Sequence, residues 1–132
     1  MKALLILPLL AAIRYAYGMS DEMKEMAKMV HDQCIEETGA SDQVIQDTTK
    51  GAFPDDQKLK CYLKCIYSNM GAITDEGTLD ADAFMSILPD DMQYLLPVIN
   101  TCKGITGADG CETAFNFNVC MYKTDSSKYL II

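Results

Sequence analysis

The six cysteines are the residues of this sequence whose type and spacing could do chemistry. Two of them, Cys61 and Cys65, stand four positions apart in the stretch KLKCYLKC. Paired cysteines can bind a metal as thiolates, run a dithiol–disulfide redox cycle, or form structural disulfides. Which of these applies decides what kind of function the sequence supports.

A metal site and a redox site both fit the cysteine spacing poorly. Zinc needs four ligands, but the cysteines after position 100 are separated by eight residues each, and His31 is the only histidine. A redox site needs C-x-x-C at a helix start after a strand, whereas Cys61 and Cys65 lie in the middle of a predicted helix. We therefore predict no metal, no cofactor and no redox activity.

Helical geometry favours structural disulfides instead. Residues four apart on a helix have Cβ atoms about 5–6 Å apart, whereas a disulfide needs roughly 3.5–4.5 Å. Cys61 and Cys65 are therefore expected to pair with different neighbours. Cys111 and Cys120, which are nine positions apart, lie on opposite sides of their helix at about 100° per residue. Six cysteines allow many pairings, of which this geometry leaves several open.

The segments that carry the cysteines combine helical periodicity with helix-capping residues. We predict six helices: from the Ser20 cap to Gly39, from the Ser41 cap to Gly51, over 55–71, from the Asp80 cap to Pro89, over 90–104, and after the Asp109 cap. Pro97 should bend or break the fifth helix. No stretch alternates at period two, so the predicted class is all-α.

The first 18 residues have the pattern of a cleaved signal peptide. Lys2 precedes an apolar run from Ala3 to Ile13, and small residues stand at Ala16 and Gly18. We therefore predict secretion into an extracellular fluid, with residues 19–132 as one domain. Six cysteines behind a signal peptide indicate three disulfides formed in an oxidising compartment.

The charge of the chain excludes some partners. The chain has 11 basic and 19 acidic residues, so removing Lys2 and Arg14 leaves 9 basic residues and changes the net charge from −8 to −10. Nucleic acid is an unfavourable partner because phosphate binding needs a basic face. An anionic membrane surface is disfavoured for the same reason, and we predict no stable membrane insertion.

The order and spacing of the cysteines resemble a known family. The gaps between consecutive cysteines from Cys34 to Cys120 are 26, 3, 36, 8 and 8 residues. This pattern, the stretch KLKCYLKC, the DEGTLD turn, the Leu88–Pro89 helix stop and the ending SKYLII resemble the six-cysteine pheromone- and general odorant-binding proteins of insects. The resemblance covers essentially all of residues 19–132.

The resemblance implies a fold, a disulfide pairing and a function. The implied fold has six helices around an internal apolar cavity, and the implied pairs are Cys34–Cys65, Cys61–Cys111 and Cys102–Cys120. The implied function is to bind odorants or pheromones, which are small hydrophobic volatile molecules, and to deliver them to membrane receptors without catalysis. An olfactory receptor is an implied partner, and formation of a homodimer stays open.

The resemblance also implies which residues line the cavity, and Met26 is added from the apolar stripe of the first helix. The expected ligand-binding residues are Met23, Met26, Ala27, Val30, Tyr62, Ile66, Phe84, Leu88, Met92, Leu96, Asn118, Met121, Tyr129, Leu130 and Ile131. Tyr62 and Asn118 are the expected polar groups, and the C-terminal tail is expected to form one wall. Methionine is flexible and polarisable, which suits a wall that fits several ligands. His31 is expected to be a surface residue and not a pH sensor.

Other functions fit the sequence less well. A hydrolase needs a base, but the chain has one histidine and no G-x-S-x-G motif, so we predict no enzyme. A saposin-like carrier is also helical with six cysteines, but its cysteine spacing should differ. Many members of the family that this chain resembles act outside olfaction, as carriers in other body fluids. Sequence alone leaves a general lipid carrier outside olfaction open as an alternative.

Overall fold

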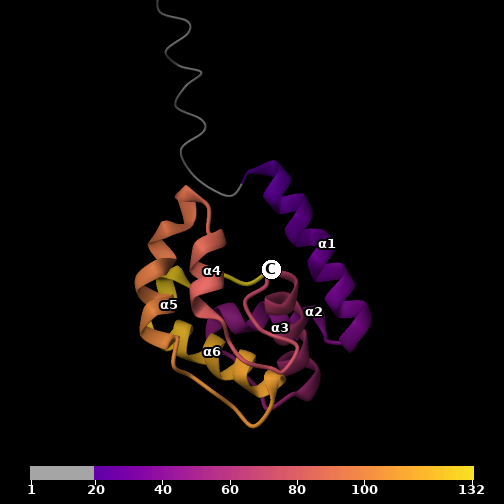
Figure 1. The fold of residues 1–132 in the computed structure, drawn as a ribbon. Coiled ribbons are helices and arrows are strands. Elements are labelled where there is room, and N and C mark those ends of the chain that lie inside the picture. The colour runs from indigo at the N-terminus through magenta and orange to yellow at the C-terminus, as the bar shows by residue number, and fades with distance from the viewer. Residues whose placement is uncertain (1–19) are drawn as a thin grey trace, which may run out of the picture.

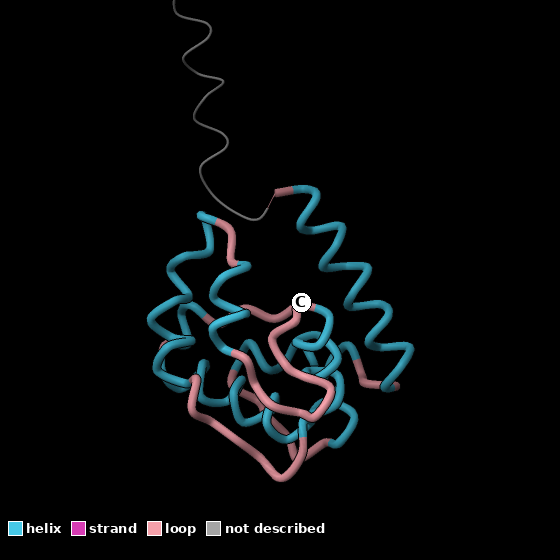
Figure 2. Tube along the Cα trace, in the orientation of Figure 1, coloured by secondary structure: helices cyan, strands magenta, loops and turns pink. Residues whose placement is uncertain are grey.

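The computed structural model of the protein describes residues 20–132, so the predicted signal peptide lies outside the described residues. Its elements are α1 (Asp21–Thr38), α2 (Asp42–Asp47), η2 (Thr48–Lys50), α3 (Gln57–Asn69), α4 (Ala81–Ile87), η3 (Asp90–Leu95), α5 (Leu96–Cys102), α6 (Gly110–Thr124) and η4 (Ser126–Lys128), where η marks a 3-10 helix. Between residues 20 and 132 there is no strand, and Ile73 and Leu79 form one isolated bridge (Figure 2). The predicted all-α class with six helices is confirmed.

The helices begin at the predicted capping residues. The Ser20 side chain accepts a hydrogen bond from the Met23 amide at 3.3 Å, and Asp109 accepts one from the Glu112 amide at 2.9 Å. These caps satisfy backbone amides that have no partner inside the first turn of a helix. Gly39 ends α1 with a φ of 69°, a left-handed conformation that glycine adopts without steric cost.

The predicted fifth helix is divided in two at its proline. Residues Asp90–Leu95 form the 3-10 helix η3, and α5 begins at Leu96 with Pro97 in its first turn. Proline is tolerated there because the first amides of a helix have no intrahelical acceptor. The predicted break is confirmed, and the change from three to 3.6 residues per turn alters which side chains point inward.

Three disulfides link four of the helices in series. One joins α1 to α3, the next joins α3 to α6, and the last joins α6 to α5, through the pairs Cys34–Cys65, Cys61–Cys111 and Cys102–Cys120. These are the pairs that the resemblance implies. Each of α3 and α6 carries two cysteines, so each of these two helices is crosslinked to two neighbouring helices.

The packing follows the same series. Helix α3 packs against α6 and α1, and α5 packs against α6 and α4. Figure 1 shows α1 on one side of the molecule and α4 with α5 on the other, with the C-terminal end of the chain between them. The space that these helices and the C-terminal residues surround is the candidate site.

Candidate ligand-binding site

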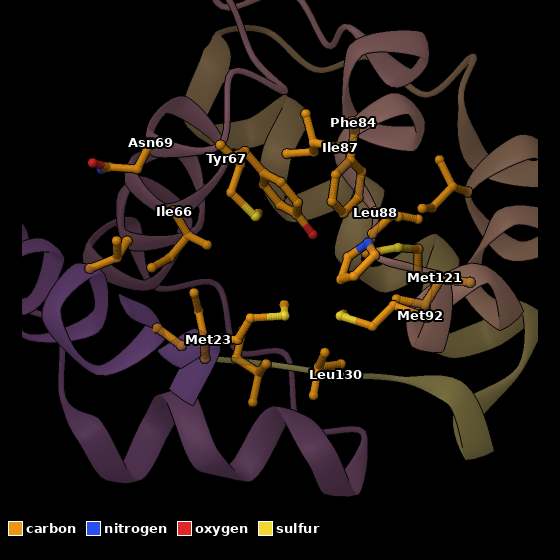
Figure 3. A pocket seen from close by; sticks show the side chains of 18 of the residues that line it. Met23, Ile66, Tyr67, Asn69, Phe84, Ile87, Leu88, Met92, Met121 and Leu130 are labelled. Atoms are coloured by element: carbon orange, nitrogen blue, oxygen red, sulfur yellow. The ribbon is translucent and has the colours of Figure 1, made fainter. Parts of the chain in front are cut away.

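An apolar pocket of about 280 Å³ lies between α1, α3, α4, α5, α6 and the C-terminal tail, which is defined here as residues 129–132 (Figure 3). Its walls are nearly all aliphatic, aromatic or thioether side chains. They include five methionines, which are Met23, Met26, Met70, Met92 and Met121. A pocket with these walls favours a small apolar molecule, because burying its surface removes that surface from water.

One wall of the pocket is built on a cluster of aromatic rings. The Tyr67 ring of α3 packs edge to face against Phe84 of α4 and Phe117 of α6, with centroid distances of 5.6 and 5.5 Å. All three rings are buried. Such contacts hold the rings in fixed orientations, so this part of the pocket is rigid.

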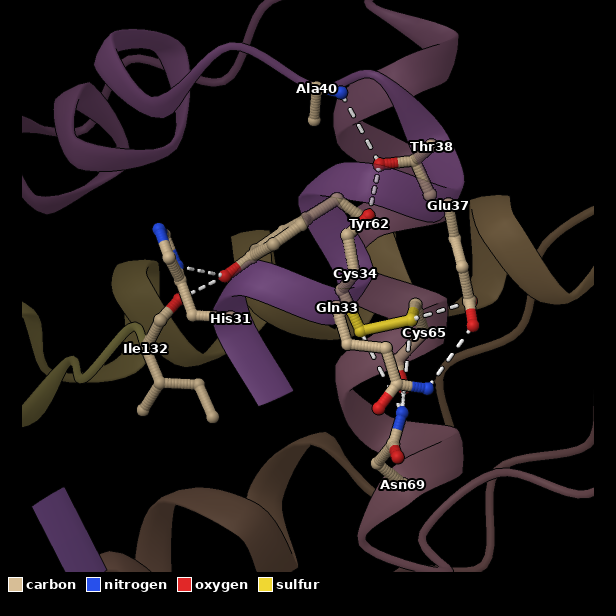
Figure 4. The surroundings of a disulfide bond; sticks show 10 residues. All are labelled: His31, Gln33, Cys34, Glu37, Thr38, Ala40, Tyr62, Cys65, Asn69 and Ile132. Carbon is tan, nitrogen blue, oxygen red and sulfur yellow. Dashed lines mark hydrogen bonds between the residues drawn. A yellow bond between two sulfur atoms is a disulfide. The ribbon is translucent and has the colours of Figure 1, made fainter. Parts of the chain in front are cut away.

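The C-terminal tail forms the opposite wall and is held at two points. The Tyr129 ring packs edge to face against Phe53 and Tyr122, with centroid distances of 5.8 and 5.5 Å. At the other end, the Tyr62 hydroxyl donates a hydrogen bond to a main-chain oxygen of Ile132 (Figure 4). All four residues of the tail line the pocket between these anchors.

Replacing Tyr62 by phenylalanine should release the end of the tail more often. The main-chain oxygen of Ile132 loses its donor. In the chain offered to the enzyme this oxygen belongs to a carboxylate, and a hydrogen bond to a charged group contributes about 1.5–3 kcal/mol, which is more than about a tenfold change in population. A carboxypeptidase should therefore remove Ile132 at least about ten times faster, because cleavage follows the population of the open form. The control is Tyr94→Phe, which changes an exposed tyrosine away from the pocket; equal cleavage rates in Y62F and Y94F would contradict the prediction.

The hydroxyl of Tyr129 is buried between polar partners. It lies 3.2 Å from both the Thr48 hydroxyl and the Asn118 side-chain oxygen. Burial raises the pKa of Tyr129 from 10.0 to about 12, which the hydrogen bond to Thr48 opposes in part. The folded protein therefore retains this proton at a pH where the unfolded chain has lost it.

Stability should accordingly fall in alkali. Below pH 10 the phenol of Tyr129 is protonated in both the folded and the unfolded chain, and its contribution to the free energy of unfolding is complete. Between pH 10 and 12 the unfolded chain binds fewer protons than the folded protein, so the free energy of unfolding decreases. The slope reaches about 1.4 kcal/mol per pH unit for one group. Urea titrations from pH 8 to 12 should show a shallower decline in Tyr129→Phe than in the wild type. Tyr94→Phe should follow the wild type, and identical slopes in all three proteins would disprove the assignment.

Most of the residues expected from the sequence do lie on the wall of this pocket. They come from α1, α3, α4, η3, α6 and the tail, and they are Met23, Met26, Ala27, Val30, Ile66, Phe84, Leu88, Met92, Met121, Tyr129, Leu130 and Ile131. Met26 lies at the rim, because 66% of its surface is exposed. The tail is therefore a wall of the pocket, although whether these residues contact a ligand stays a proposal.

Three of the expected residues are not on the wall. Tyr62 is fully buried, and its hydroxyl holds the tail instead of facing the pocket. The Asn118 side chain donates to the Ala114 carbonyl at 2.9 Å and faces Tyr129. Leu96 lies outside the wall because the helical phase changes at the start of α5, where Leu95 lines the pocket in its place.

The sequence reasoning also left out several residues that line the pocket. Leu63, Tyr67 and Met70 share a helical face with Ile66, so helical periodicity could have assigned them to the pocket as well. Leu95 and Val98 follow Met92 at intervals of three, which is the period of a 3-10 helix and not of an α-helix. The remaining lining residues are Asn69, Ile87, Pro89, Ile99, Lys128 and Ile132.

The prediction that His31 is a surface residue is wrong. Its side chain is only 17% exposed, and its Nε2 lies 3.0 Å from a carboxylate oxygen of Asp42. Its Nδ1 lies 2.6 Å from the Tyr62 hydroxyl (Figure 4). The reason is tertiary, because the chain turns back after Gly39 and α2 brings Asp42 against the side of α1.

The fold and the pocket together define a class of protein. It is an all-α protein crosslinked by three disulfides, with an apolar pocket of a size that suits a small molecule. No helix between residues 20 and 132 is long and apolar enough to span a bilayer. In the same range, histidine, cysteine, aspartate and glutamate side chains form no group that could hold a metal.

Comparison with known proteins places the chain within this class. Residues 17–124 match the PBP/GOBP family, and the chain belongs to that family. General odorant-binding protein 69a of Drosophila melanogaster is 28% identical over 120 residues, which are 89% of this chain and 81% of that protein. The family is one of carriers that are not known as enzymes, and membership implies binding of small hydrophobic ligands.

Solved structures have the same fold. Odorant-binding protein 4 of Chrysopa pallens superposes with a TM-score of 0.77 and 32% identity, over 88% of this chain and all of that one. Odorant-binding protein 7 of Anopheles gambiae, solved with four disulfide bridges and an azo compound, has a TM-score of 0.72 and 28% identity over 83% of this chain and 91% of that one. These similarities confirm the predicted family.

Proposed function

We propose that this protein is an extracellular carrier that binds small hydrophobic molecules, such as odorants or pheromones, in the pocket and delivers them to membrane receptors. The observation that carries the proposal is the pocket itself, whose wall combines five methionines with a C-terminal tail held at both ends. Methionine side chains adapt to different ligand shapes. The two tail anchors keep the wall in place while a ligand is bound.

The complex of Anopheles gambiae odorant-binding protein 7 with an azo compound supports the proposal by analogy. Secretion is supported by the family and by the signal-peptide pattern of residues 1–18. Delivery to a receptor is the most specific part of the proposal, and it requires that the ligand leave the pocket again. The tail is the candidate for the moving part, since it is a short terminal segment.

The experiment is displacement of N-phenyl-1-naphthylamine, an uncharged probe whose fluorescence rises when it leaves water. The protein without its first 18 residues should bind the probe, and a panel of volatile esters, ketones and alcohols should displace it. The matched control is Val98→Asp, which places a carboxylate on the wall of the pocket. Binding that is absent in the wild type, or unchanged in V98D, would overturn the proposal; binding to liposomes without any probe binding would instead indicate a membrane-active protein.

A further inference from the structure

The pocket has very few polar groups on its wall, and most of them already have partners in the protein. The Asn69 amide nitrogen donates to the Cys65 carbonyl at 2.9 Å, and its side chain is directed away from the centre of the pocket (Figure 3). Lys128 pairs with Asp125 at 3.6 Å. The Tyr129 hydroxyl is engaged at the base of the tail, as described above.

The hydroxyl of Tyr67 differs from these groups. It points from the aromatic cluster into the pocket (Figure 3), and the polar side chain that faces its oxygen is Asn118. The Asn118 nitrogen can only donate, and its oxygen already accepts a hydrogen bond from Tyr129, so Asn118 offers the Tyr67 O–H no free acceptor. The rings of Phe84 and Phe117 hold the Tyr67 ring in place, so the hydroxyl cannot turn away.

This hydroxyl is protonated at neutral pH and can therefore donate a hydrogen bond. Burial raises the pKa of Tyr67 well above its ordinary value, and the Asn118 side chain lowers it only in part. A buried hydroxyl without a partner is unfavourable, and filling the pocket with a hydrocarbon would remove any water that solvates it. A ligand that supplies an acceptor avoids this penalty.

We propose that the Tyr67 hydroxyl makes the pocket select uncharged apolar molecules that carry a hydrogen-bond-accepting oxygen, such as ketones, esters and alcohols, over hydrocarbons of the same shape. The inference rests on the proposed function and specifies its ligand class. The oxygen of the ligand lies toward α3 and the aromatic cluster, and its hydrocarbon chain lies along the methionines and the tail. Sites built to hydrogen-bond a ligand reject analogues that lack the bonding atom, because the protein group is then left unpaired.

The test compares two ligands that have the same carbon skeleton apart from one group. In 2-undecanone a carbonyl oxygen stands where 2-methyl-1-undecene has a methylene group. Displacement of N-phenyl-1-naphthylamine gives the affinity of each ligand. The ratio of the ketone affinity to the alkene affinity is independent of any change in the affinity of the probe. The ratio should fall about three- to tenfold in Tyr67→Phe, which is the range of one neutral hydrogen bond.

The control is Tyr94→Phe, the same chemical change on an exposed tyrosine outside the pocket, and its ratio should equal that of the wild type. If both ligands displace the probe and the ratio is the same in the wild type and Y67F, the inference is wrong while the carrier function stands. If neither ligand nor the probe binds the wild type, the carrier function fails and the inference with it.

A second measurement needs no variant. The infrared stretch of 2-undecanone labelled with carbon-13 at the carbonyl should shift to lower frequency in the wild-type complex than in hexane, because a donated hydrogen bond weakens the carbonyl bond. The same frequency in the protein and in hexane would overturn the inference even if Y67F did not fold.

Discussion

Replacing both Cys61 and Cys111 by alanine should lower the free energy of unfolding by about 4 kcal/mol. This disulfide joins residues 50 positions apart and links α3 to α6, the two helices that carry the other crosslinks. A crosslink of this span restricts the unfolded chain by an entropy worth roughly that amount. Native proteins have only about 5–15 kcal/mol of stability, so this variant should be close to unfolding at moderate temperature.

The measurement is equilibrium unfolding in urea, followed by far-UV circular dichroism. The matched control is the double replacement of Cys102 and Cys120, which are only 18 positions apart and whose crosslink is worth about 3 kcal/mol by the same relation. The wild type should be most stable and the Cys61–Cys111 variant least stable. A loss below about 1 kcal/mol for the longer crosslink would show that the α3–α6 contact holds without it.

Deleting Leu130, Ile131 and Ile132 should weaken binding of N-phenyl-1-naphthylamine about tenfold. These three residues line the pocket, and a tenfold loss corresponds to roughly 55 Å² of apolar contact at about 25 cal/mol per Å². Ending the chain at Tyr129 keeps the ring that packs against Phe53 and Tyr122. The truncated protein should therefore fold, and its loss of affinity should come from the missing wall.

The control for the truncation is Met29→Ala, which removes an apolar side chain that is 71% exposed on α1 and lies outside the pocket. Its affinity should equal that of the wild type. Fluorescence titration gives both dissociation constants, and circular dichroism verifies the helical content. An unchanged affinity in the truncated protein would mean that the tail does not contact the bound molecule.

The fold was predictable because its signals are local. A capping serine or aspartate satisfies amides within its own first turn, as Ser20 and Asp109 do, and Gly39 ends its helix through its own backbone conformation. Such signals can be read without knowing what the helix packs against. The disulfide pairs are different: helical geometry showed that Cys61 and Cys65 must have separate partners, and only the family resemblance indicated which.

The candidate site was predictable only in part. Residues such as Met23 and Ile66 lie on the wall because they belong to regular stripes of their helices. Leu96 was expected from the family resemblance, whereas the turns before Pro97 are 3-10 and bring Leu95 inward. A change of helix type of this kind has a weak signature in sequence, because both types of helix accept the same residues.

The sequence by itself determined the class of fold, the number of helices and the presence of covalent crosslinks, since these follow from short-range periodicity, caps and cysteine spacing. Only the tertiary structure decided that Tyr62 holds the tail, that His31 is enclosed by Asp42 and that the Tyr67 hydroxyl faces the pocket. The physical reason is that each of these roles depends on contacts between residues far apart in the chain. The direction of a buried hydroxyl is set by the neighbours that surround it, and those neighbours are brought together by folding.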